Sequence, residues 1–384
     1  MSRRPSSSKT RDLPPPVVVT TEPQLAALLD DLTGQSAIAV DTESNSLHAY
    51  REQVCLMQLS TRETDYVVDL LAGLDISSLA HFFASLDVQK VFHAAEYDVM
   101  CLKRDFGFQF VNLFDTMWAA RILGWPRVGL GNVLKETFGV KTNKRYQRHN
   151  WGRRPIKPEA LAYAARDTHY LLPLRHLQAE ALLQNGRWDE AKEVFEQVAA
   201  SQPVSNEFDP EGFWRIKGAW DLDRRQQAVL RELAIWRDGE ARRLDRPLFK
   251  VLHDRTLTAL AAALPRSSEA LAGVDGLSPR LVHRYARPLL RAIERGLQAP
   301  KPVPPPPPPR HSSEEVDRFQ ALRAWRKQVA AERGVEPDVI VGNAVLWALA
   351  ERVPPTVEAM ADVEGFGLWK QQTYGETILT ILQA

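Results

Sequence analysis

Four carboxylates and one tyrosine, spread over three short segments, are the residues whose types and spacing could do chemistry together. Asp41 and Glu43 end an apolar run two residues apart, and residues i and i+2 of a strand project to the same side. Tyr163 and Asp167 are four residues apart in a stretch of helical periodicity, so they share one face of a helix. Asp98 closes a third segment, which follows another apolar run. Each pair can therefore face a single bound object.

A group of carboxylates of this kind favours hard metal ions. Carboxylates that a fold brings together raise one another's pKa values, and a dication removes that repulsion. An all-oxygen ligand set suits Mg²⁺ or Mn²⁺, and two such ions, roughly 3.5–4 Å apart, can hold the attacking and leaving oxygens of a phosphodiester in line. Cys55 and Cys101 are far apart and lack zinc-ligand partners at the usual spacing. Such a set could therefore hold divalent ions of the kind that phosphodiester chemistry uses.

The order, spacing and flanks of these residues resemble the three exonuclease motifs of the DEDD superfamily, in the branch with tyrosine in the third motif. Over residues 20–195 the chain is similar to the ribonuclease D family and to the related exonuclease subunit of the eukaryotic nuclear exosome. Asn150 departs from the family pattern, which usually has an acid before the tryptophan, but it lies outside the metal set. The segments that carry the resemblance are 38–47, 54–60, 91–98, 112–116, 143–155 and 163–172.

The resemblance implies a role for each of the five residues. Asp41, Glu43 and Asp167 would ligate the ions directly, and Asp98 would support the second ion. Tyr163 would aim the attacking water; an unperturbed tyrosine has a pKa of about 10, which favours an orienting phenol over a phenolate base. The implied activity is that of a metal-dependent 3′→5′ exoribonuclease that trims tRNA precursors and other structured RNAs and releases nucleoside 5′-monophosphates.

Basic and aromatic residues alternate just ahead of the third motif. Basic groups interleaved with aromatic rings can hold phosphates and stack unpaired bases. A solvated loop before a helix would have a similar composition, but the position beside the motif favours substrate contact. The residues predicted to contact RNA are Lys144, Arg145, Tyr146, Arg148, Trp151 and Arg154.

The first half predicts an α/β domain. Strands are expected near 36–43, 54–60, 64–69, 89–93 and 110–115, and helices near 22–33, 76–86, 96–106, 115–123, 129–138 and 158–184. The first three strands follow one another with short connections and should pair antiparallel. Strands first, then strands alternating with helices, indicate a mixed five-stranded sheet flanked by helices. The resemblance implies that this is a ribonuclease H-like fold.

The second half repeats itself at an interval of 89 residues, so that Leu233 matches Leu322, Gly276 matches Gly365 and Tyr285 matches Tyr374. Both copies are helical in pattern and resemble the helicase-and-RNase-D C-terminal (HRDC) domain, a small all-α bundle. We therefore divide the chain into a disordered lead-in at 1–17, an exonuclease domain at 18–200, a connecting segment at 201–221, a first HRDC domain at 222–299, a proline-rich linker at 300–313 and a second HRDC domain at 314–384.

The charge differs between the two copies, although the 384-residue chain has a net charge of only +1. Residues 222–299 hold 15 Lys and Arg against 9 Asp and Glu, whereas residues 314–384 hold 7 against 11. Phosphate contact requires a basic excess. We therefore expect the first copy to bind RNA, and the acidic copy to pack on the catalytic domain, close a ring or meet a protein partner.

The remaining composition indicates a cytoplasmic protein without a membrane segment, and a monomer is the simplest expectation. No apolar run approaches the ~20 residues of a membrane span, the basic N-terminus lacks the apolar stretch of a secretion signal, and two cysteines fit a reducing compartment. The chain has no Walker A loop, which excludes a helicase motor. Two alternatives remain open: an exonuclease of the same fold that acts on DNA, and an RNA-binding scaffold with a decayed site, against which the intact carboxylate set counts.

Overall fold

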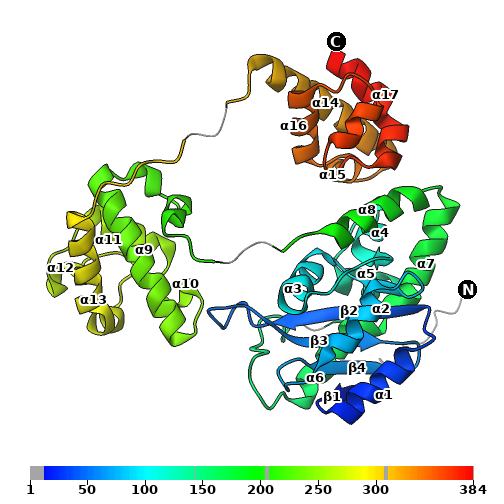
Figure 1. Ribbon diagram of the computed structural model, residues 1–384, viewed down its shortest axis with the longest axis horizontal. Helices are drawn as coiled ribbons and strands as arrows, with labels where there is room; N and C mark the ends of the chain where they lie inside the picture. The colour runs from blue at the N-terminus through cyan, green and yellow to red at the C-terminus, as the bar shows by residue number, and fades with distance from the viewer. Residues whose placement is uncertain (1–12, 143, 204–206, 307–309, 384) are drawn as a thin grey trace, which may run out of the picture. The chain divides into compact units, whose positions relative to one another are not determined.

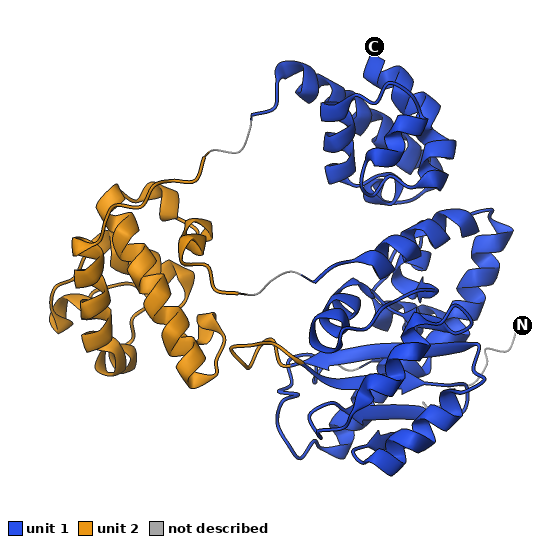
Figure 2. Ribbon diagram, viewed as in Figure 1, with its two compact units in different colours: residues 1–44, 54–203, 309–384 blue, residues 45–53, 204–308 orange. Residues whose placement is uncertain are grey.

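The computed structural model describes residues 13–142, 144–203, 207–306 and 310–383. The chain forms two compact units (Figure 2). The first combines the sheet domain with the C-terminal helices, and the second combines residues 204–308 with residues 45–53. No helix in the described ranges is long and apolar enough to span a bilayer.

A mixed six-stranded sheet forms the centre of the N-terminal domain (Figure 1). Its spatial order is β1-β4-β3-β2-β5-β6. As predicted, β2 pairs antiparallel with β3 and β3 with β4, whereas β5 and β6 continue the sheet in parallel. The strands are β1 (Val17–Val19), β2 (Ala37–Ser44), β3 (Val54–Ser60), β4 (Asp65–Asp69), β5 (Gln89–Phe92) and β6 (Leu113–Asp115).

The prediction of five strands was wrong by one. β1 pairs parallel with β4 and begins at Val17, which the sequence assigned to a disordered lead-in. Most of that lead-in, residues 1–12, lies outside the described residues. A three-residue strand directly after Pro14-Pro15-Pro16 has too little pattern to be recognised without its partner, because alternation needs about four residues to show.

Helices cover both faces of the sheet. They are α1 (Glu22–Leu32), η1 (Ile76–Leu79), α2 (Ala80–Ala84), α3 (Glu96–Phe106), α4 (Thr116–Ile122), α5 (Leu130–Phe138), α6 (Pro158–His169), α7 (Leu171–Gln184) and α8 (Trp188–Ala200). The single helix predicted over 158–184 is two helices, which meet at Tyr170. Proline at position 158 starts α6, as expected for a residue without an N–H in the first turn.

One of these helices, α6, positions the third motif. It packs on β3, β4 and β2, and its alanines form a small apolar cluster with Leu56 and Val67 of the sheet and with the buried Trp151. Most of the remaining apolar side chains of the domain belong to a larger core rich in phenylalanine. The strands β2 and β3 therefore lie fixed beneath α6.

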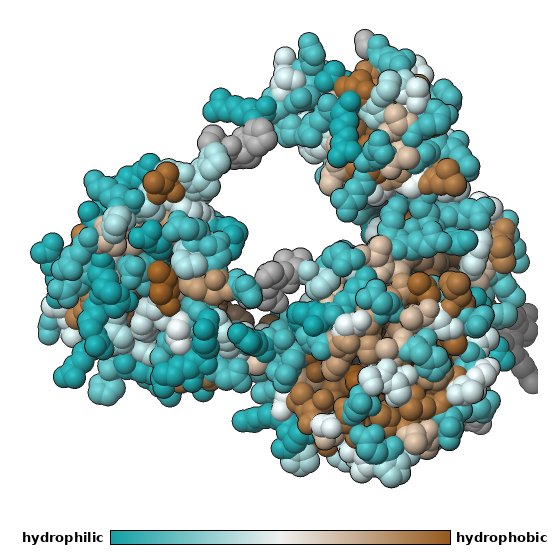
Figure 3. All heavy atoms as spheres, viewed as in Figure 1, coloured by the Kyte–Doolittle hydropathy of each residue, from teal (hydrophilic) through white to brown (hydrophobic). Residues whose placement is uncertain are grey.

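The second unit is a helical bundle. Its helices are α9 (Arg224–Leu244), α10 (Leu248–Val251), α11 (Asp254–Ala263), α12 (Ser268–Ala272) and α13 (Pro279–Gln298). Two short helices, η2 (Pro210–Arg215) and η3 (Ala219–Asp221), precede α9, and Phe213 and Trp214 are buried in the bundle core. Much of the segment predicted as a connector is therefore part of this bundle. Its visible face is mostly hydrophilic, whereas apolar side chains gather on the visible face of the sheet domain (Figure 3).

The C-terminal bundle repeats the same internal contacts 89 residues later. Arg237 donates to the Leu252 carbonyl at 3.0 Å, and Arg326 donates to the Val341 carbonyl at 2.7 Å. The ring centroids of Trp236 and Tyr285 lie 5.3 Å apart, and those of Trp325 and Tyr374 lie 5.4 Å apart, both pairs inclined by 74°. The elements of this copy are α14 (Ser313–Arg333), α15 (Pro337–Ile340), α16 (Asn343–Arg352), η4 (Glu358–Asp362) and α17 (Leu368–Gln383).

This acidic copy docks on α8 of the sheet domain. Glu190 is only 1% exposed and accepts two hydrogen bonds from Arg333, at 3.0 and 2.5 Å. Glu193 accepts from the Lys370 ammonium at 2.8 Å and from the Trp369 backbone N–H at 2.6 Å. Val339 is buried in the core of the sheet domain. Of the three roles expected for the acidic copy, the structure shows the first, packing on the catalytic domain.

Candidate active site

Three of the predicted metal ligands meet above the centre of the sheet. Asp41 and Glu43 project from β2, and Asp167 projects from α6, which crosses that strand. Each offers a carboxylate oxygen, and these three atoms all lie within 4.8 Å of one another. The strand period of two and the helix period of 3.6 residues therefore bring together groups that are 126 positions apart in the sequence.

Asp98 lies beside this group rather than in it. It is in the first turn of α3, is 7% exposed, and accepts a hydrogen bond from the Thr42 hydroxyl of β2. Burial raises the pKa of Asp98 to about 7, against the opposing effect of that hydrogen bond. Its charge also raises the pKa of Asp41 and of Glu43. Asp98 is therefore close enough to share in the electrostatics of the group without being one of its three converging ligands.

A buried carboxylate that the sequence did not single out holds α3 in place. Asp115, at the end of β6, is fully buried and accepts backbone N–H bonds from Ala94 and Ala95 at 3.1 and 2.8 Å. It also accepts from Met117 and Trp118, which caps the N-terminus of α4. Its position before a helix signals the cap, but the bonds to the segment before α3 depend on tertiary contact.

The electrostatics of the site favour a bound cation. Burial first, and then the charges of Asp98, Asp167 and Glu43, raise the pKa of Asp41 well above its usual range. Burial and the charges of Asp167 and Asp98 raise the pKa of Glu43 to about 9. Burial raises the pKa of Asp167 to about 7. An all-oxygen set of desolvated, mutually repelling carboxylates fits a hard divalent ion, which would neutralise them together.

Tyr163 is held beside these carboxylates by aromatic packing. Its ring centroid is 5.5 Å from that of Tyr146 and 6.4 Å from that of Trp151. Burial and the charges of Asp167, Glu43 and Asp41 raise the pKa of Tyr163 far above its ordinary value. In the metal-free protein the side chain is therefore a neutral phenol at physiological pH, able to form hydrogen bonds.

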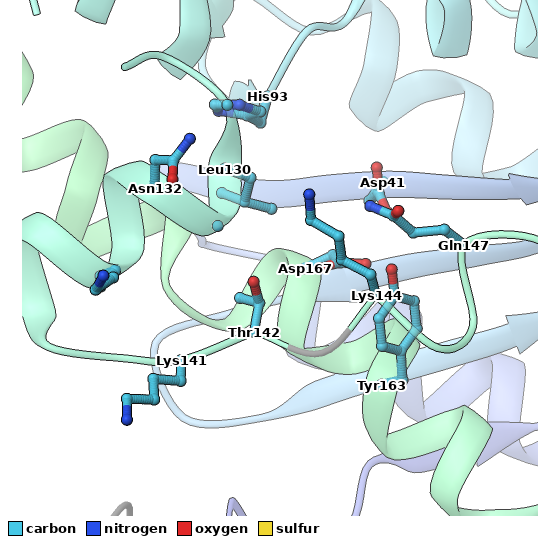
Figure 4. Close-up of a pocket in the computed structure, with 13 residues that line it drawn as sticks. Asp41, His93, Leu130, Asn132, Lys141, Thr142, Lys144, Gln147, Tyr163 and Asp167 are labelled. Atoms are coloured by element: carbon cyan, nitrogen blue, oxygen red, sulfur yellow. The ribbon is translucent and has the colours of Figure 1, made fainter. Parts of the chain in front are cut away.

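A cavity of about 570 Å³ opens over Asp41, Tyr163 and Asp167. Figure 4 shows these side chains converging on it, with Lys144 and Gln147 extending from the loop that precedes α6. The other lining residues come from the start of α5 and from the segments beside it: His93, Gly129, Leu130, Gly131, Asn132, Lys135, Lys141 and Thr142. Three lysines and two acids line the cavity, which makes it suited to a phosphate-bearing chain end.

The residues predicted to contact RNA divide into two groups. Lys144 lines the cavity, while Arg145 and Arg148 are exposed and Arg145 lies over the Tyr146 ring at 5.6 Å. Trp151, in contrast, is 1% exposed, so it is not available to stack on a base.

Trp151 and Arg154 make contacts that hold the site and its loop in place. A hydrogen bond from the Trp151 side chain lowers the pKa of Glu43 against the larger effect of burial. Arg154 donates to both oxygens of Asp69 at 2.5 Å and to the Cys55 carbonyl, so it anchors the loop to the sheet. The interpretation of Trp151 as an RNA contact is therefore corrected to a structural role, whereas contact of the exposed Arg154 with RNA stays a prediction.

Two histidines beside the motifs differ in their surroundings. His93 lines the cavity, its Nδ1 lies 2.9 Å from the Thr116 hydroxyl, and burial lowers its pKa to about 4, so the ring is neutral at physiological pH. His169 lies outside this cavity, with its Nδ1 2.7 Å from an oxygen of Asp65. Of these two histidines, only His93 therefore borders the cavity.

The fold and the site define a 3′→5′ exonuclease with two HRDC domains. Residues 16–180 match the 3'-5' exonuclease family, and residues 226–293 and 315–382 each match the HRDC domain. This class fits the acidic site on β2, α3 and α6 and the internally repeated helical bundles. It also implies that the activity depends on divalent metal.

Relatives of known function narrow the class to one family. Ribonuclease D of Acidiphilium cryptum is 33% identical over 69% of this chain and 68% of its own length. The crystal structure of Escherichia coli RNase D, described as an exoribonuclease involved in structured RNA processing, superposes with a TM-score of 0.70 at 25% identity, over 96% of this chain and 98% of that one. Exosome complex exonuclease RRP6 of Saccharomyces cerevisiae is 32% identical over 77% of this chain, which spans 44% of that relative. The chain belongs to the ribonuclease D family, and it is a hydrolytic 3′→5′ exoribonuclease.

Proposed function

We propose that two divalent ions, Mg²⁺ or Mn²⁺, occupy the site, with Asp41, Glu43 and Asp167 as direct ligands and Asp98 supporting the second ion. The observation that carries this proposal is the convergence of three desolvated carboxylate oxygens within 4.8 Å. When bound, such ions lower the pKa of the attacking water and stabilise the attacking and leaving oxygens of a phosphodiester.

The protein's own residues would position the RNA 3′ end. Tyr163, a neutral phenol beside Asp167, would hold the attacking water by a hydrogen bond and align it with the terminal phosphodiester. Lys144 and Lys141, on the loop that lines the cavity, would contact the phosphates. Hydrolysis would release nucleoside 5′-monophosphates one at a time.

The substrates would be tRNA precursors and other structured RNAs with 3′ tails. What supports this choice is the family, together with the name of the Escherichia coli relative, an exoribonuclease involved in structured RNA processing. The basic excess of residues 222–299 supports a second RNA contact outside the catalytic cavity. We further propose that the protein acts as a cytoplasmic monomer.

The test is a comparison of matched substrates. The purified full chain is incubated with a structured RNA bearing a 3′ tail and with a single-stranded DNA of the tail sequence, each in Mg²⁺, Mn²⁺ or EDTA. We expect a ladder of single-nucleotide shortening from the RNA 3′ end in either ion and none in EDTA. Preferential degradation of the DNA would contradict the proposed substrate.

Matched variants test the ligand assignment. Asp41→Asn and Asp167→Asn should each lower the rate by orders of magnitude, because each removes charge where two dications must be held. Asp30→Asn, an exposed change on α1, is the control and should leave the rate unchanged. Near-normal activity of Asp41→Asn would refute the assignment.

A further inference from the structure

Gln58, in the middle of β3, is a buried amide without a partner. It is 0% exposed, and neither its Nε2 nor its Oε1 makes a hydrogen bond with any residue that the structure describes. In that part of the chain it is the one side chain for which two buried polar atoms are both unpaired. Buried polar groups are nearly always paired, so an exception of this kind calls for a physical reason.

The register of the sheet places Gln58 next to the metal ligands. Gln58 is the direct antiparallel partner of Asp41 on β2 and of Val67 on β4. Opposed residues of an antiparallel pair project to the same face, with their Cβ atoms roughly 4.5–5.5 Å apart. The preceding residue on that face of β3, Leu56, is the partner of Glu43 and packs in the cluster beneath α6. Gln58 therefore lies under α6, beside the carboxylate of Asp41.

A polar side chain two residues along the same face of β3 has hydrogen-bond partners. Ser60, the next residue of β3 on the same face, donates to Asp65 at 2.6 Å and bonds Thr168 of α6 at 2.7 Å. Asp65 in turn bonds His169. An apolar side chain of similar volume at position 58 would extend the cluster of Leu56 and Val67 without leaving unpaired atoms.

We propose that Gln58 is a positioning residue for Asp41, its Nε2–H donating to the Asp41 carboxylate in the metal-bound protein. This inference rests on the proposed function, because it assumes that Asp41 is a ligand. Ligating carboxylates are themselves hydrogen-bonded to outer partners that fix their orientation. The Thr42 hydroxyl donates to Asp98 and the Thr42 backbone N–H donates to Asp41, and Gln58 is the further side-chain donor that the register brings beside Asp41.

The chemistry of an amide suits this position. A lysine would carry a positive charge into a site that must hold dications. A glutamate would add another negative charge to four carboxylates whose pKa values are already raised. A glutamine donates without either charge. Its two side-chain methylenes also give it the reach to cross the space between opposed strands.

The test is metal affinity, measured separately from activity. Gln58→Met keeps the volume and removes the donor. Calorimetric titration of the full-length variant with Mn²⁺ should show binding weakened by roughly 10- to 100-fold, the usual effect of losing such a partner. In EDTA its melting temperature should equal or exceed that of the wild type, because an unpaired buried amide has been removed.

A second buried amide provides the matched control. Gln178 of α7 is also 0% exposed, its Oε1 is unpaired, and its Nε2 donates to the Thr116 carbonyl at 2.9 Å. Gln178→Met should lower the melting temperature and leave Mn²⁺ affinity unchanged. If Gln58→Met behaves in that way, the role of Gln58 is structural and the inference is overturned.

A shorter amide covers the case in which the methionine variant does not fold. Gln58→Asn keeps the donor but withdraws it by one methylene, so Mn²⁺ affinity should again fall at least tenfold. Affinity within twofold of the wild type would overturn the inference. Asp41→Asn distinguishes failure of the metal-site assignment from failure of the role given to Gln58. If Asp41→Asn abolishes Mn²⁺ binding while both Gln58 variants bind normally, only the inference about Gln58 fails. If Asp41→Asn binds Mn²⁺ normally, the proposed metal site itself fails.

Discussion

Replacing Glu43 by glutamine should stabilise the metal-free protein at neutral pH. The folded state holds the pKa of Glu43 at about 9, against an ordinary value of 4.5. A pKa raised on folding means that the stability it brings at low pH is lost as the pH rises from 4.5 toward 9. At pH 7 about 2.5 units of that range have been crossed, and at 1.4 kcal/mol per unit the wild type has lost roughly 3 kcal/mol.

Glu43→Gln removes this pH-dependent loss while keeping an acceptor for the Trp151 side chain. In EDTA at pH 7 we expect the free energy of unfolding to rise by up to roughly 3 kcal/mol, which corresponds to roughly 6–12 °C in melting temperature for a domain of this size. At pH 5 the two proteins should differ little. Saturating Mn²⁺ should reverse the order, because the ion binds the folded wild type and not the variant.

The assay is thermal unfolding in EDTA at pH 5, 7 and 8. Because the chain has more than one compact unit, the transition to follow is the one that Mn²⁺ shifts in the wild type. A variant that is no more stable than the wild type at pH 7 would refute the reasoning. A gain of the same size at all three pH values would also refute it, since it would not come from the titration of Glu43.

Three further outcomes are expected. Tyr163→Phe should retain Mn²⁺ affinity in calorimetry while hydrolysis slows by roughly 10²-fold or more, because a positioning group is lost and no ligand is. The fragment 207–299, which includes η2 and η3, should bind tRNA more tightly than the fragment 314–384 in the same salt, and its affinity should fall more steeply as salt rises. Glu190→Ala should lower the free energy of unfolding of the first unit by roughly 3–5 kcal/mol, because the buried guanidinium of Arg333 would lose its carboxylate partner.

Controls for these outcomes lie close to the residues tested. Tyr170→Phe, at the junction of α6 and α7 and outside the cavity, should leave hydrolysis unchanged. Glu180→Ala, which removes an exposed i,i+4 partner of His176, should change the free energy of unfolding by less than about 1 kcal/mol. Equal binding of tRNA by the two fragments would contradict the assignment of RNA contact to the basic copy.

The convergence of Asp41, Glu43 and Asp167 could be predicted because short-range geometry determines where their side chains point. The i, i+2 spacing on β2 and the i, i+4 spacing on α6 each select one face, and the sheet and helix then meet at those faces. The internal repeat could also be predicted, because its matched residues recur at a constant interval in the sequence. In the structure these residues make the same contacts in each copy.

Other features depend on partners distant in the sequence. Because Trp151 is flanked by basic residues, the sequence predicts a ring that stacks on bases, whereas in the structure Trp151 is buried against Leu56 and Val67 of the sheet. The sequence predicts a phosphate contact for Arg154, and in the structure Arg154 donates to Asp69, 85 positions earlier. The break between α6 and α7 had a local signal, since Pro173 has no N–H to donate to the carbonyl of residue 169 and its ring clashes with that carbonyl, and α6 ends at His169. The buried partner of the acidic copy, α8, has no such signal in the sequence.

The docking of the acidic copy on α8 makes the two copies unequal targets for mutation. A Cβ added at Gly367 would lie 2.2 Å from Glu193, so any side chain there would have to displace the contact, whereas the matching position in the basic copy is Ser278. Lys370 likewise matches Leu281, and Arg333 matches Leu244. Substitutions at Gly367, Lys370 or Arg333 would therefore disturb a contact within the first unit, whereas the matching residues of the basic copy belong to the second unit.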